Sequence, residues 1–517
     1  MFDATIRSMI SSPADDAPAL GAPGRNWLSY GALRALSERA ASALRKAGIG
    51  ATDRVAIVLP NGPEMAAAFV TLAQAATTAP LNPAYREDEF AFYLEDLGAR
   101  AIVLARDDEG PALAAARRHG LTVLRLSADP AGPAGSFTLA AEGAPREAAP
   151  DGAPGADDVA LILHTSGTTS RPKIVPLLQR NLAASARHIA DSLELTPADR
   201  CLNVMPLFHI HGLVAAVSAS LAAGGSVWCA PGFDALRFFS WLKDARPSWY
   251  TAVPTMHQAI LARAPRNAEI IAGARLRFLR SSSASLPGPV MTRLAETFGA
   301  PVIEGYGMTE AAHQMASNPL PPRAQKPGSV GLPAGPELRL ADETEDRLLT
   351  GAGPDDVGEV VISGPNVTPG YEANPEANAK SFFEAEGRRW FRTGDQGAFD
   401  AEGYLTLTGR LKEIINRGGE KVSPLEVDGV LSEHPAIAQV VTFALPHDKL
   451  GEEVAAAAVL REGASATERD IRDFAAGRLA DFKVPRRVVI VDEIPKGATG
   501  KLQRIGLAAK LGLVESA

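Results

Sequence analysis

The chain has 517 residues, of which 46% are hydrophobic and 22% are charged, a composition that is ordinary for a globular enzyme with more than one domain. Its 60 acidic residues outnumber its 52 basic residues, and a net charge of −8 without a basic tract argues against nucleic acid as a partner. No run of about 18 apolar residues is present, which argues against a membrane helix and a membrane partner.

The cysteines and the ends of the chain predict its compartment. Two cysteines, Cys201 and Cys229, are too few for a disulfide framework and fit a reducing environment. The first residues, MFDATIRSMISS, contain one Arg and no long apolar stretch, so they do not form a secretory signal. The last residues, GLVESA, are not a peroxisomal SKL address. We therefore expect a cytoplasmic protein.

Apolar runs that predict strands alternate with Ala-rich amphipathic stretches that predict helices. The expected strands are 55–59, 101–105, 159–164, 276–279 and 301–303. The expected helices are 63–75, 234–245 and 290–298. This alternation is typical of α/β layers with parallel sheets. The acidic, Pro/Gly/Ala-rich stretch 141–158 has no periodicity, and we interpret it as an exposed loop rather than a domain boundary, although its composition permits either.

The most informative segment is LILHTSGTTSRPKIVPL, residues 161–177. An apolar run ends there in small and hydroxylated residues, and Lys173 follows shortly after them. Backbone N–H groups, hydroxyls and a nearby cation are what is needed to wrap the β- and γ-phosphates of a nucleotide. The loop is not a Walker A loop, because the second Gly and the Gly-Lys-Ser/Thr ending are missing. Its hydroxyls belong to Thr165, Ser166, Thr168, Thr169 and Ser170.

A second motif, EGYGMTEAAH at 304–313, follows an expected strand and combines a hydroxyl, a carboxylate and an aromatic ring. One interpretation is a strand-to-helix turn in which Thr309 or Glu310 caps the first turn. The other gives Thr309 the α-phosphate of a nucleotide, Glu310 a Mg²⁺ ion, which prefers oxygen ligands, and Tyr306 the adenine. Spacing alone does not decide between them.

From about residue 358 the chain becomes rich in strands, and from about Lys412 we expect a small α+β domain with helices at 424–432 and 468–479. Two motifs in this half contain further candidate polar residues. FRTGDQGAFD contains Asp395, and PKGATGKLQR contains Lys501. By itself an aspartate in a turn is usually structural, and a lone lysine is usually solvated.

In this order, TSGTT-x-x-PK, EGYGMTE, TGD, TGRLKE and PK-x-x-x-GK-x-x-R resemble the signatures of the adenylate-forming superfamily of acyl-CoA synthetases, carrier-protein adenylation domains and luciferases. The phosphate loop departs from the usual pattern at Ser170 and Ile174, where members usually have Gly. The resemblance implies an α/β fold with two domains. A large N-terminal AMP-binding domain of layered α/β subdomains would span 1–410, and a small mobile C-terminal α+β domain would span 411–517.

The resemblance also implies a chemistry. A carboxylic acid is activated with ATP and Mg²⁺ as an acyl adenylate, pyrophosphate leaves, and coenzyme A then displaces AMP. Lys501 would bridge the reacting carboxylate and the α-phosphate, where a cation stabilises the transition state. Asp395 and Arg410 would bind the ribose, and Lys412 would mark the hinge of the domain rotation that brings 418–420 to the pantetheine arm. The residues that the resemblance places at ATP, Mg²⁺ or coenzyme A are Thr165, Ser166, Gly167, Thr168, Thr169, Lys173, Glu304, Gly305, Tyr306, Thr309, Glu310, Asp395, Arg410, Gly418, Gly419 and Glu420.

Three residues are candidates for contact with the acid. His209, in MPLFHIHG, matches a position common in the family and is interpreted as an acyl-pocket gate or packing residue. Ser283, in RSSSASLPG, and His313 would lie near the acyl end, where fatty acid ligases have apolar or glycine-rich walls. Hydroxyl and imidazole groups are unfavourable beside an alkyl chain, because an unpaired buried donor costs roughly 1–3 kcal/mol. They suit a second carboxylate, which would accept from Ser283 and favour a protonated His313. The sequence therefore predicts a small dicarboxylate substrate.

Longer segments, among them RSSSASL, KPGSVGLPAG and LKEIINRGGEKVSP, are similar to the oxalyl-CoA synthetases, or oxalate–CoA ligases, and imply oxalate as the acid. Three alternatives stay open. A ligase for malonate, a short- or medium-chain acid or a coumarate-like acid would share every catalytic motif. An adenylation module would need a carrier protein, and no carrier segment is recognisable after Arg504. The third alternative, a non-catalytic nucleotide-binding relative, is opposed by intact Lys173, Glu310, Asp395, Arg410 and Lys501.

Overall fold

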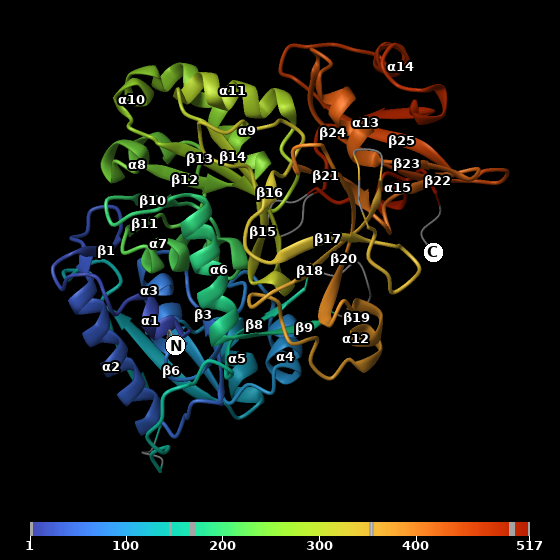
Figure 1. Cartoon of the computed structure of the whole chain (residues 1–517). Coiled ribbons are helices and arrows are strands. Elements are labelled where there is room, and N and C mark those ends of the chain that lie inside the picture. Colours follow the sequence, from blue (N-terminus) through green and yellow to red (C-terminus); the bar gives the residue numbers. More distant parts are fainter. Residues whose placement is uncertain are drawn as a thin grey trace.

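The computed structural model describes residues 4–143, 147–165, 172–350, 353, 356–495 and 502–514. These residues form four β-sheets with helices packed against them (Figure 1). Two of the sheets are large and mostly parallel, and two are smaller and mostly antiparallel. Across the described ranges, no helix is both long enough and apolar enough to cross a membrane.

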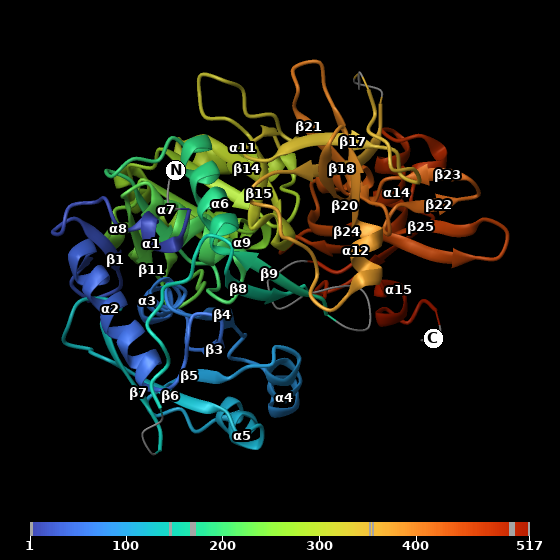
Figure 2. The ribbon, with the colours of Figure 1, turned by 60° about the horizontal axis from the view of Figure 1, so that its bottom comes forward.

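The first large sheet has seven strands in the order β7-β6-β5-β3-β4-β8-β9. Its central strands pair in parallel, whereas β7 and β9 pair antiparallel at the two edges. Helices α4 (Glu87–Asp96) and α5 (Pro111–Arg118) cover one face, and α2 (Tyr30–Lys46) and α3 (Pro63–Leu72) cover the other (Figure 2). The central strands are unbroken apolar runs because both of their faces are buried. The strands are β3 (Arg54–Val58), β4 (Thr77–Pro80), β5 (Ala101–Ala105), β6 (Thr122–Ala128), β7 (Phe137–Ala141), β8 (Val159–His164) and β9 (Ile174–Leu178).

The second large sheet has nine strands in the order β16-β15-β14-β13-β12-β10-β11-β1-β2, with β2, β15 and β16 antiparallel to their neighbours. The strands are β1 (Pro18–Gly21), β2 (Leu28–Ser29), β10 (Arg200–Asn203), β11 (Ser226–Cys229), β12 (Trp249–Ala252), β13 (Phe278–Ser282), β14 (Val302–Met308), β15 (His313–Ser317) and β16 (Leu332–Pro333). The helices on one face are α8 (Phe238–Ala245), α9 (Pro254–Arg263), α10 (Ala268–Gly273) and α11 (Gly288–Phe298). The other face is covered by α6 (Gln179–Ser192) and the π-helix η1 (His211–Ser218). The short helices are α1 (Ile6–Met9), α7 (Ala219–Ala222), η2 (Ala264–Asn267) and η3 (Thr309–Ala311).

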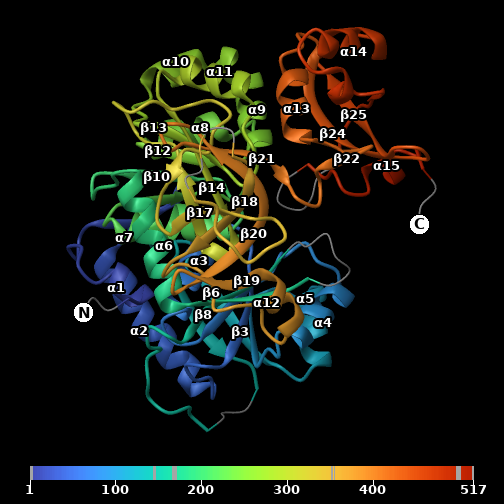
Figure 3. The same cartoon turned by 45° about the vertical axis from the view of Figure 1, so that its right-hand side comes forward.

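The third sheet is an antiparallel one in the order β17-β18-β20-β19, with β21 paired to β20. Its elements are β17 (Glu337–Ala341), β18 (Gly358–Ser363), α12 (Pro375–Ser381), β19 (Phe382–Ala385), β20 (Arg388–Phe399) and β21 (Leu405–Arg410). The fourth sheet, in the order β23-β22-β25-β24 with β26 beside β25, is buried on both faces by its own helices (Figure 3). Its elements are β22 (Ile415–Arg417), β23 (Glu420–Val422), α13 (Pro424–Ser432), β24 (Ile437–His447), β25 (Gly451–Leu460), α14 (Glu468–Ala476), η4 (Asp481–Lys483), β26 (Arg487–Ile490) and α15 (Leu507–Lys510).

The expected α/β organisation is confirmed, with the largest differences at β13 and β14. The strands expected at 101–105 and 159–164 and the helix expected at 424–432 have those bounds. The strand expected at 276–279 is instead Phe278–Ser282, because three polar residues, Arg280 to Ser282, are buried within the sheet. The short run expected at 301–303 continues as a strand to Met308. Within 142–158 the described residues form neither helix nor strand.

Candidate active site

The predicted phosphate loop joins the antiparallel strands β8 and β9. The Thr165 N–H donates to the Lys173 carbonyl at 3.0 Å, and the Lys173 N–H donates to Thr165 Oγ1 at 3.2 Å. These two bonds fix both ends of the loop in register, because they continue the pairing of the strands. The other predicted members of the loop, which lie outside the described residues, are Ser166, Gly167, Thr168 and Thr169.

Lys173 and Glu310 meet around Tyr371. The Lys173 ammonium lies 4.2 Å from the centroid of the Tyr371 ring, and the Tyr371 hydroxyl donates to Glu310 Oε1 at 2.7 Å. Burial lowers the pKa of Lys173, and the positive charge of Lys412 lowers it further. The Glu310 carboxylate opposes this decrease. Burial raises the pKa of Glu310, whereas the Tyr371 hydrogen bond and the Lys173 charge oppose the rise. Sequence analysis missed Tyr371, whose only signal is its place after Gly370 in GPNVTPGY.

Strand β14 carries the predicted residues Glu304, Gly305 and Tyr306. Positions 304 and 306 are on one face of the strand and position 305 is on the other. Glu304 is buried, and its Oε1 accepts a 2.8 Å hydrogen bond from the Leu286 N–H. Burial raises the pKa of Glu304 to about 8. This carboxyl group therefore holds the backbone of the loop after β13. Thr309 begins η3 directly after the strand.

Tyr306, Asp395 and Arg410 form one hydrogen-bonded group. The Tyr306 hydroxyl donates to Asp395 Oδ2 at 2.5 Å, and Arg410 Nε lies 3.3 Å from Asp395 Oδ1. Asp395 on β20 and Arg410 on β21 are opposite each other in the sheet. The Asp395 charge raises the pKa of Arg410, and burial raises the pKa of Tyr306 well above its usual range. The structure thus brings together three residues that the sequence predicts for the ribose and the adenine.

His211 links the residues predicted to contact the acid. Its Nδ1 lies 3.0 Å from Ser283 Oγ, and its Nε2 lies 2.6 Å from Thr251 Oγ1. The His211 ring centroid is 5.2 Å from the His313 ring centroid. The backbone N–H of His211 donates to His209 Nδ1 at 3.3 Å. His211 and His313 are both buried. Sequence analysis gave His211 no role, although it follows His209 by two residues in MPLFHIHG.

The two residues chosen for the acid also have unusual backbone geometry. Ser283 has φ of +76° and His313 has φ of +108°, in the region that favours glycine. Such conformations cost about 1–3 kcal/mol each and persist only where the surrounding contacts determine them. They cluster at functional sites, which supports the choice of Ser283 and His313.

The predicted glycine pair lies in the turn between β22 and β23. Gly418 has φ of +62° and Gly419 has φ of +100°, so both need the freedom of glycine. The Gly418 N–H donates to the Leu450 carbonyl at 2.9 Å, and the Gly419 N–H donates to Asn416 Oδ1 at 3.1 Å. Exposed Glu420 follows at the start of β23. At Gly418 and Gly419 the turn therefore exposes backbone that carries no side chain.

The sheet that contains this turn contacts the rest of the protein through polar side chains. Lys421 pairs with Glu343 at 2.6 Å, and Gln439 Nε2 donates to Gln258 Oε1 at 3.2 Å. Lys412 lies in the four-residue connection between β21 and β22. Lys501 lies outside the described residues. Such polar contacts between units are easily exchanged for water, which suits a unit that changes orientation.

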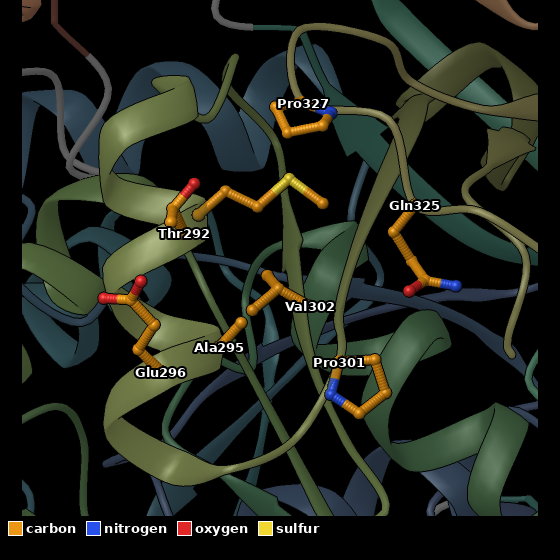
Figure 4. Close-up of a pocket in the computed structure, with 8 residues that line it drawn as sticks. Thr292, Ala295, Glu296, Pro301, Val302, Gln325 and Pro327 are labelled. Carbon is orange, nitrogen blue, oxygen red and sulfur yellow. The ribbon is translucent and has the colours of Figure 1, made fainter.

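One surface hollow, of about 240 Å³, lies away from these clusters (Figure 4). It is formed between α11 and the segment that contains Gln325 and Pro327. None of the residues that line it is a predicted ligand, so we do not assign it to the site. The lining residues are Met291, Thr292, Ala295, Glu296, Pro301, Val302, Gln325 and Pro327.

Residues 11–372 match the family described as AMP-binding enzyme, and residues 426–501 match the AMP-binding enzyme C-terminal domain. The chain is 47% identical over 508 residues to an oxalate--CoA ligase of Arabidopsis thaliana, with 97% of each chain covered. It is 42% identical over 474 residues to an oxalate--CoA ligase of Saccharomyces cerevisiae, with 87% of this chain and 86% of that one covered. The fold matches ATP-bound MatB from Rhodopseudomonas palustris with a TM-score of 0.85, at 30% identity and 97% coverage of both chains.

Proposed function

The chain belongs to the AMP-binding enzyme family, and from this membership we propose that it joins oxalate to coenzyme A at the expense of ATP. An oxygen of one oxalate carboxylate attacks the α-phosphorus of ATP, oxalyl-AMP forms, and pyrophosphate leaves. The thiol of coenzyme A then attacks the acyl carbon, the thioester forms, and AMP leaves. The observation that carries this proposal is the 47% identity to the Arabidopsis oxalate--CoA ligase over nearly the whole of both chains.

The nucleotide would bind across the groups described above. The loop that begins at Thr165 and ends at Lys173 wraps the β- and γ-phosphates, and Thr309 binds the α-phosphate. Asp395 accepts hydrogen bonds from the ribose hydroxyls. Arg410, whose Nε lies 3.3 Å from Asp395 Oδ1, holds the Asp395 carboxylate in place. The ring of Tyr306 lies against the adenine, while its hydroxyl, bonded to Asp395, ties the ribose and adenine positions together.

Glu310 is the proposed ligand of Mg²⁺. Its buried carboxylate offers oxygen atoms, which this cation prefers, and the described residues contain no group of three or more His, Cys, Asp or Glu arranged around a metal ion. A single carboxylate fits an ion that arrives with the triphosphate and keeps phosphate and water oxygens as its other ligands. The bound cation would neutralise negative charge on the phosphates. Tyr371 keeps the Glu310 carboxylate charged and oriented for this task.

We expect Tyr371→Phe to move the acid limb of the pH–rate profile upward by about one pH unit. Loss of the hydroxyl removes a hydrogen bond that lowers the pKa of Glu310, so the carboxylate becomes protonated at a higher pH. Oxalate-dependent exchange of pyrophosphate into ATP, measured from pH 5 to 9, would show this. Tyr404→Phe is the matched control, because its hydroxyl donates at 2.9 Å to the Ala324 carbonyl in the distant 318–331 segment. Identical acid limbs in the wild type and Tyr371→Phe would contradict the role of Tyr371.

The second carboxylate of oxalate would be recognised by the cluster that His211 forms with Ser283, His313 and His209. A hydrogen-bond chain in which Thr251 donates to His211 Nε2, and His211 Nδ1–H donates to Ser283 Oγ, leaves the Ser283 hydroxyl hydrogen for the substrate. His313 supplies a second donor from the other side of the His211 ring. His209, whose Nδ1 accepts from the His211 backbone N–H, is the proposed gate for the acid. A site with such donors rejects acids that lack a second carboxylate, because the donors would then be left unpaired.

The unit formed by 411–517 would act as a mobile domain, with 1–410 as the AMP-binding domain. In the first orientation Lys501 bridges the oxalate carboxylate and the α-phosphate. Rotation about Lys412 then removes Lys501 and brings Gly418, Gly419 and Glu420 to the pantetheine arm of coenzyme A. The narrow backbone of the glycine pair and the polar contacts between the units support this division.

Partners beyond oxalate, ATP and coenzyme A are not required by this scheme. We propose that the protein works in the cytoplasm without nucleic acid, membrane or carrier-protein partners. The two cysteines are free and buried, which fits a reducing compartment. The chain bears a net charge of −8, which is unfavourable for contact with nucleic acid or an anionic membrane surface.

The proposal is tested by a panel of acids with the wild-type protein. Oxalate, malonate, a medium-chain acid and 4-coumarate are each incubated with ATP and Mg²⁺, with and without coenzyme A, and AMP, pyrophosphate and acyl-CoA are measured. We expect oxalate to give the highest kcat/KM and sustained AMP release only when coenzyme A is present. A higher kcat/KM for another acid would show that this acid, and not oxalate, is the preferred substrate. AMP release without any acyl-CoA would exclude a CoA ligase.

A further inference from the structure

Arg280 on β13 is a fully buried guanidinium whose charge no described residue balances. Its Nη2 donates to Gln314 Oε1 at 3.1 Å, while Nε and Nη1 have no hydrogen-bond partner among the described residues. Within those same residues, none of its contacts is an ion pair. A buried charge without a partner is among the most unfavourable features of a folded protein. Such a group therefore needs an explanation.

The acidic groups near Arg280 do not supply the missing charge. Burial raises the pKa of the Cys201 thiol well above its usual range, so the thiol is neutral at pH 7. Glu304, on the neighbouring strand β14, is opposite Ser281, so its side chain lies on the other face of the sheet. Burial also raises the pKa of Glu304 to about 8. The pKa of Arg280 is lowered to about 10, so the guanidinium remains charged at pH 7.

Arg280 is next to residues that adjoin the cluster proposed for oxalate. Arg280 is opposite Thr251 on β12, and Thr251 is 2.6 Å from His211 Nε2. On the other side, the Arg280 side chain extends over Gly305 to Gln314. The approach to Gly305 is so close that a Cβ at this position would be only 2.7 Å from Arg280 Nη2. Gln314 directly follows His313. Arg280 therefore lies between Thr251, which contacts His211, and Gln314, which is adjacent in sequence to the proposed donor His313.

We propose that Arg280 is a specificity-determining residue, whose buried positive charge stabilises the second negative charge of a bound dicarboxylate across the layer formed by Thr251 and His211. The proposal rests on the proposed function, because it requires a dianionic substrate. A neutral donor would satisfy Gln314 equally well, so the hydrogen bond alone does not require a charged residue. At an effective dielectric constant of about 20, unit charges about 8–10 Å apart change binding roughly 10- to 30-fold. Arg280 would thus select a dianion over a monoanion of the same shape.

The test compares oxalate with oxamate, which has nearly the same shape but one charge, in the wild type, Arg280→Met and Arg280→Lys. The KM for oxalate and the inhibition constant of oxamate against oxalate are measured, together with the unfolding midpoint of each ligand-free protein. In Arg280→Met we expect the preference for oxalate over oxamate to fall about tenfold, with an unfolding midpoint equal to or above that of the wild type. Arg280→Lys, which keeps the charge, should retain most of the preference.

A purely structural role predicts a different pattern. In that case Arg280→Met would lower the unfolding midpoint or prevent folding, and any folded variant would weaken oxalate and oxamate equally. Either result would overturn the proposal while wild-type turnover of oxalate left the proposed function intact. A wild-type protein that turned over another acid but not oxalate would instead contradict the proposed function, and this inference with it.

Discussion

Replacing Lys501 by Ala is expected to slow the formation of oxalyl-AMP by at least about 10²- to 10³-fold. In its proposed role the ammonium group would stabilise charge that moves onto the transferring oxygens, and it would hold together a carboxylate and a phosphate that repel each other. In the proposed scheme this stabilisation is confined to the first half-reaction, because the proposed domain rotation removes Lys501 before coenzyme A attacks. Thiolysis of preformed oxalyl-AMP should therefore proceed at close to the wild-type rate.

The two half-reactions are measured separately. Exchange of pyrophosphate into ATP reports the first, and release of AMP from added oxalyl-AMP and coenzyme A reports the second. Lys510→Ala is the matched control, because Lys510 lies on α15 in the same unit and is exposed. Equal losses in both half-reactions would show that Lys501 stabilises the domain rather than the transition state of adenylation.

The second large effect is expected at the acid pocket. Ser283→Ala and His313→Ala should each lower kcat/KM for oxalate about 10- to 100-fold, because each removes a donor that we propose for the second carboxylate. Binding of ATP should be unchanged, since Asp395 and Lys173, which are proposed for the nucleotide, contact Tyr306 and Tyr371. Isothermal titration with ATP and steady-state assays with oxalate measure the two effects independently.

Backbone strain at Ser283 needs its own control. Ser283 has φ of +76°, so Ser283→Gly removes the hydroxyl while relieving the strain. We expect Gly and Ala at this position to lose oxalate turnover to a similar extent. Ser240→Ala on α8, whose hydroxyl donates to the Arg237 carbonyl at 2.7 Å, controls for loss of a serine elsewhere. Full oxalate turnover in Ser283→Gly would show that the hydroxyl does not bind the substrate.

The sequence predicted the layered α/β organisation because its central strands are continuous apolar runs with both faces buried. Ala101–Ala105 is such a run, and its bounds were predicted without error. Phe278–Ser282 was placed incorrectly because its last three residues are polar and yet buried. Hydrophobic periodicity does not detect the end of a strand whose last three buried residues are an arginine and two serines. The error thus fell at the strand that borders the proposed acid pocket.

Part of the site could be predicted because short motifs of the family carry its residues. Asp395 and Arg410 were expected to act together, and the structure places them opposite each other on adjacent strands. The roles of Tyr371 and His211 could not be predicted, because each depends on contacts between segments far apart in the chain. Tyr371 meets Glu310 over a separation of 61 residues, and His211 meets Ser283 over one of 72. No local sequence pattern predicts a contact between residues so far apart in the chain.

The central claim is that a mixed anhydride between oxalate and AMP precedes the thioester, and the fate of one oxygen atom tests it most directly. The wild-type reaction is run with oxalate labelled with ¹⁸O in all positions, and the products are analysed by mass spectrometry. Attack of the carboxylate on the α-phosphorus predicts one ¹⁸O atom in the phosphate of each AMP formed with oxalyl-CoA, and none in pyrophosphate. Unlabelled AMP, or label in pyrophosphate, would contradict the account.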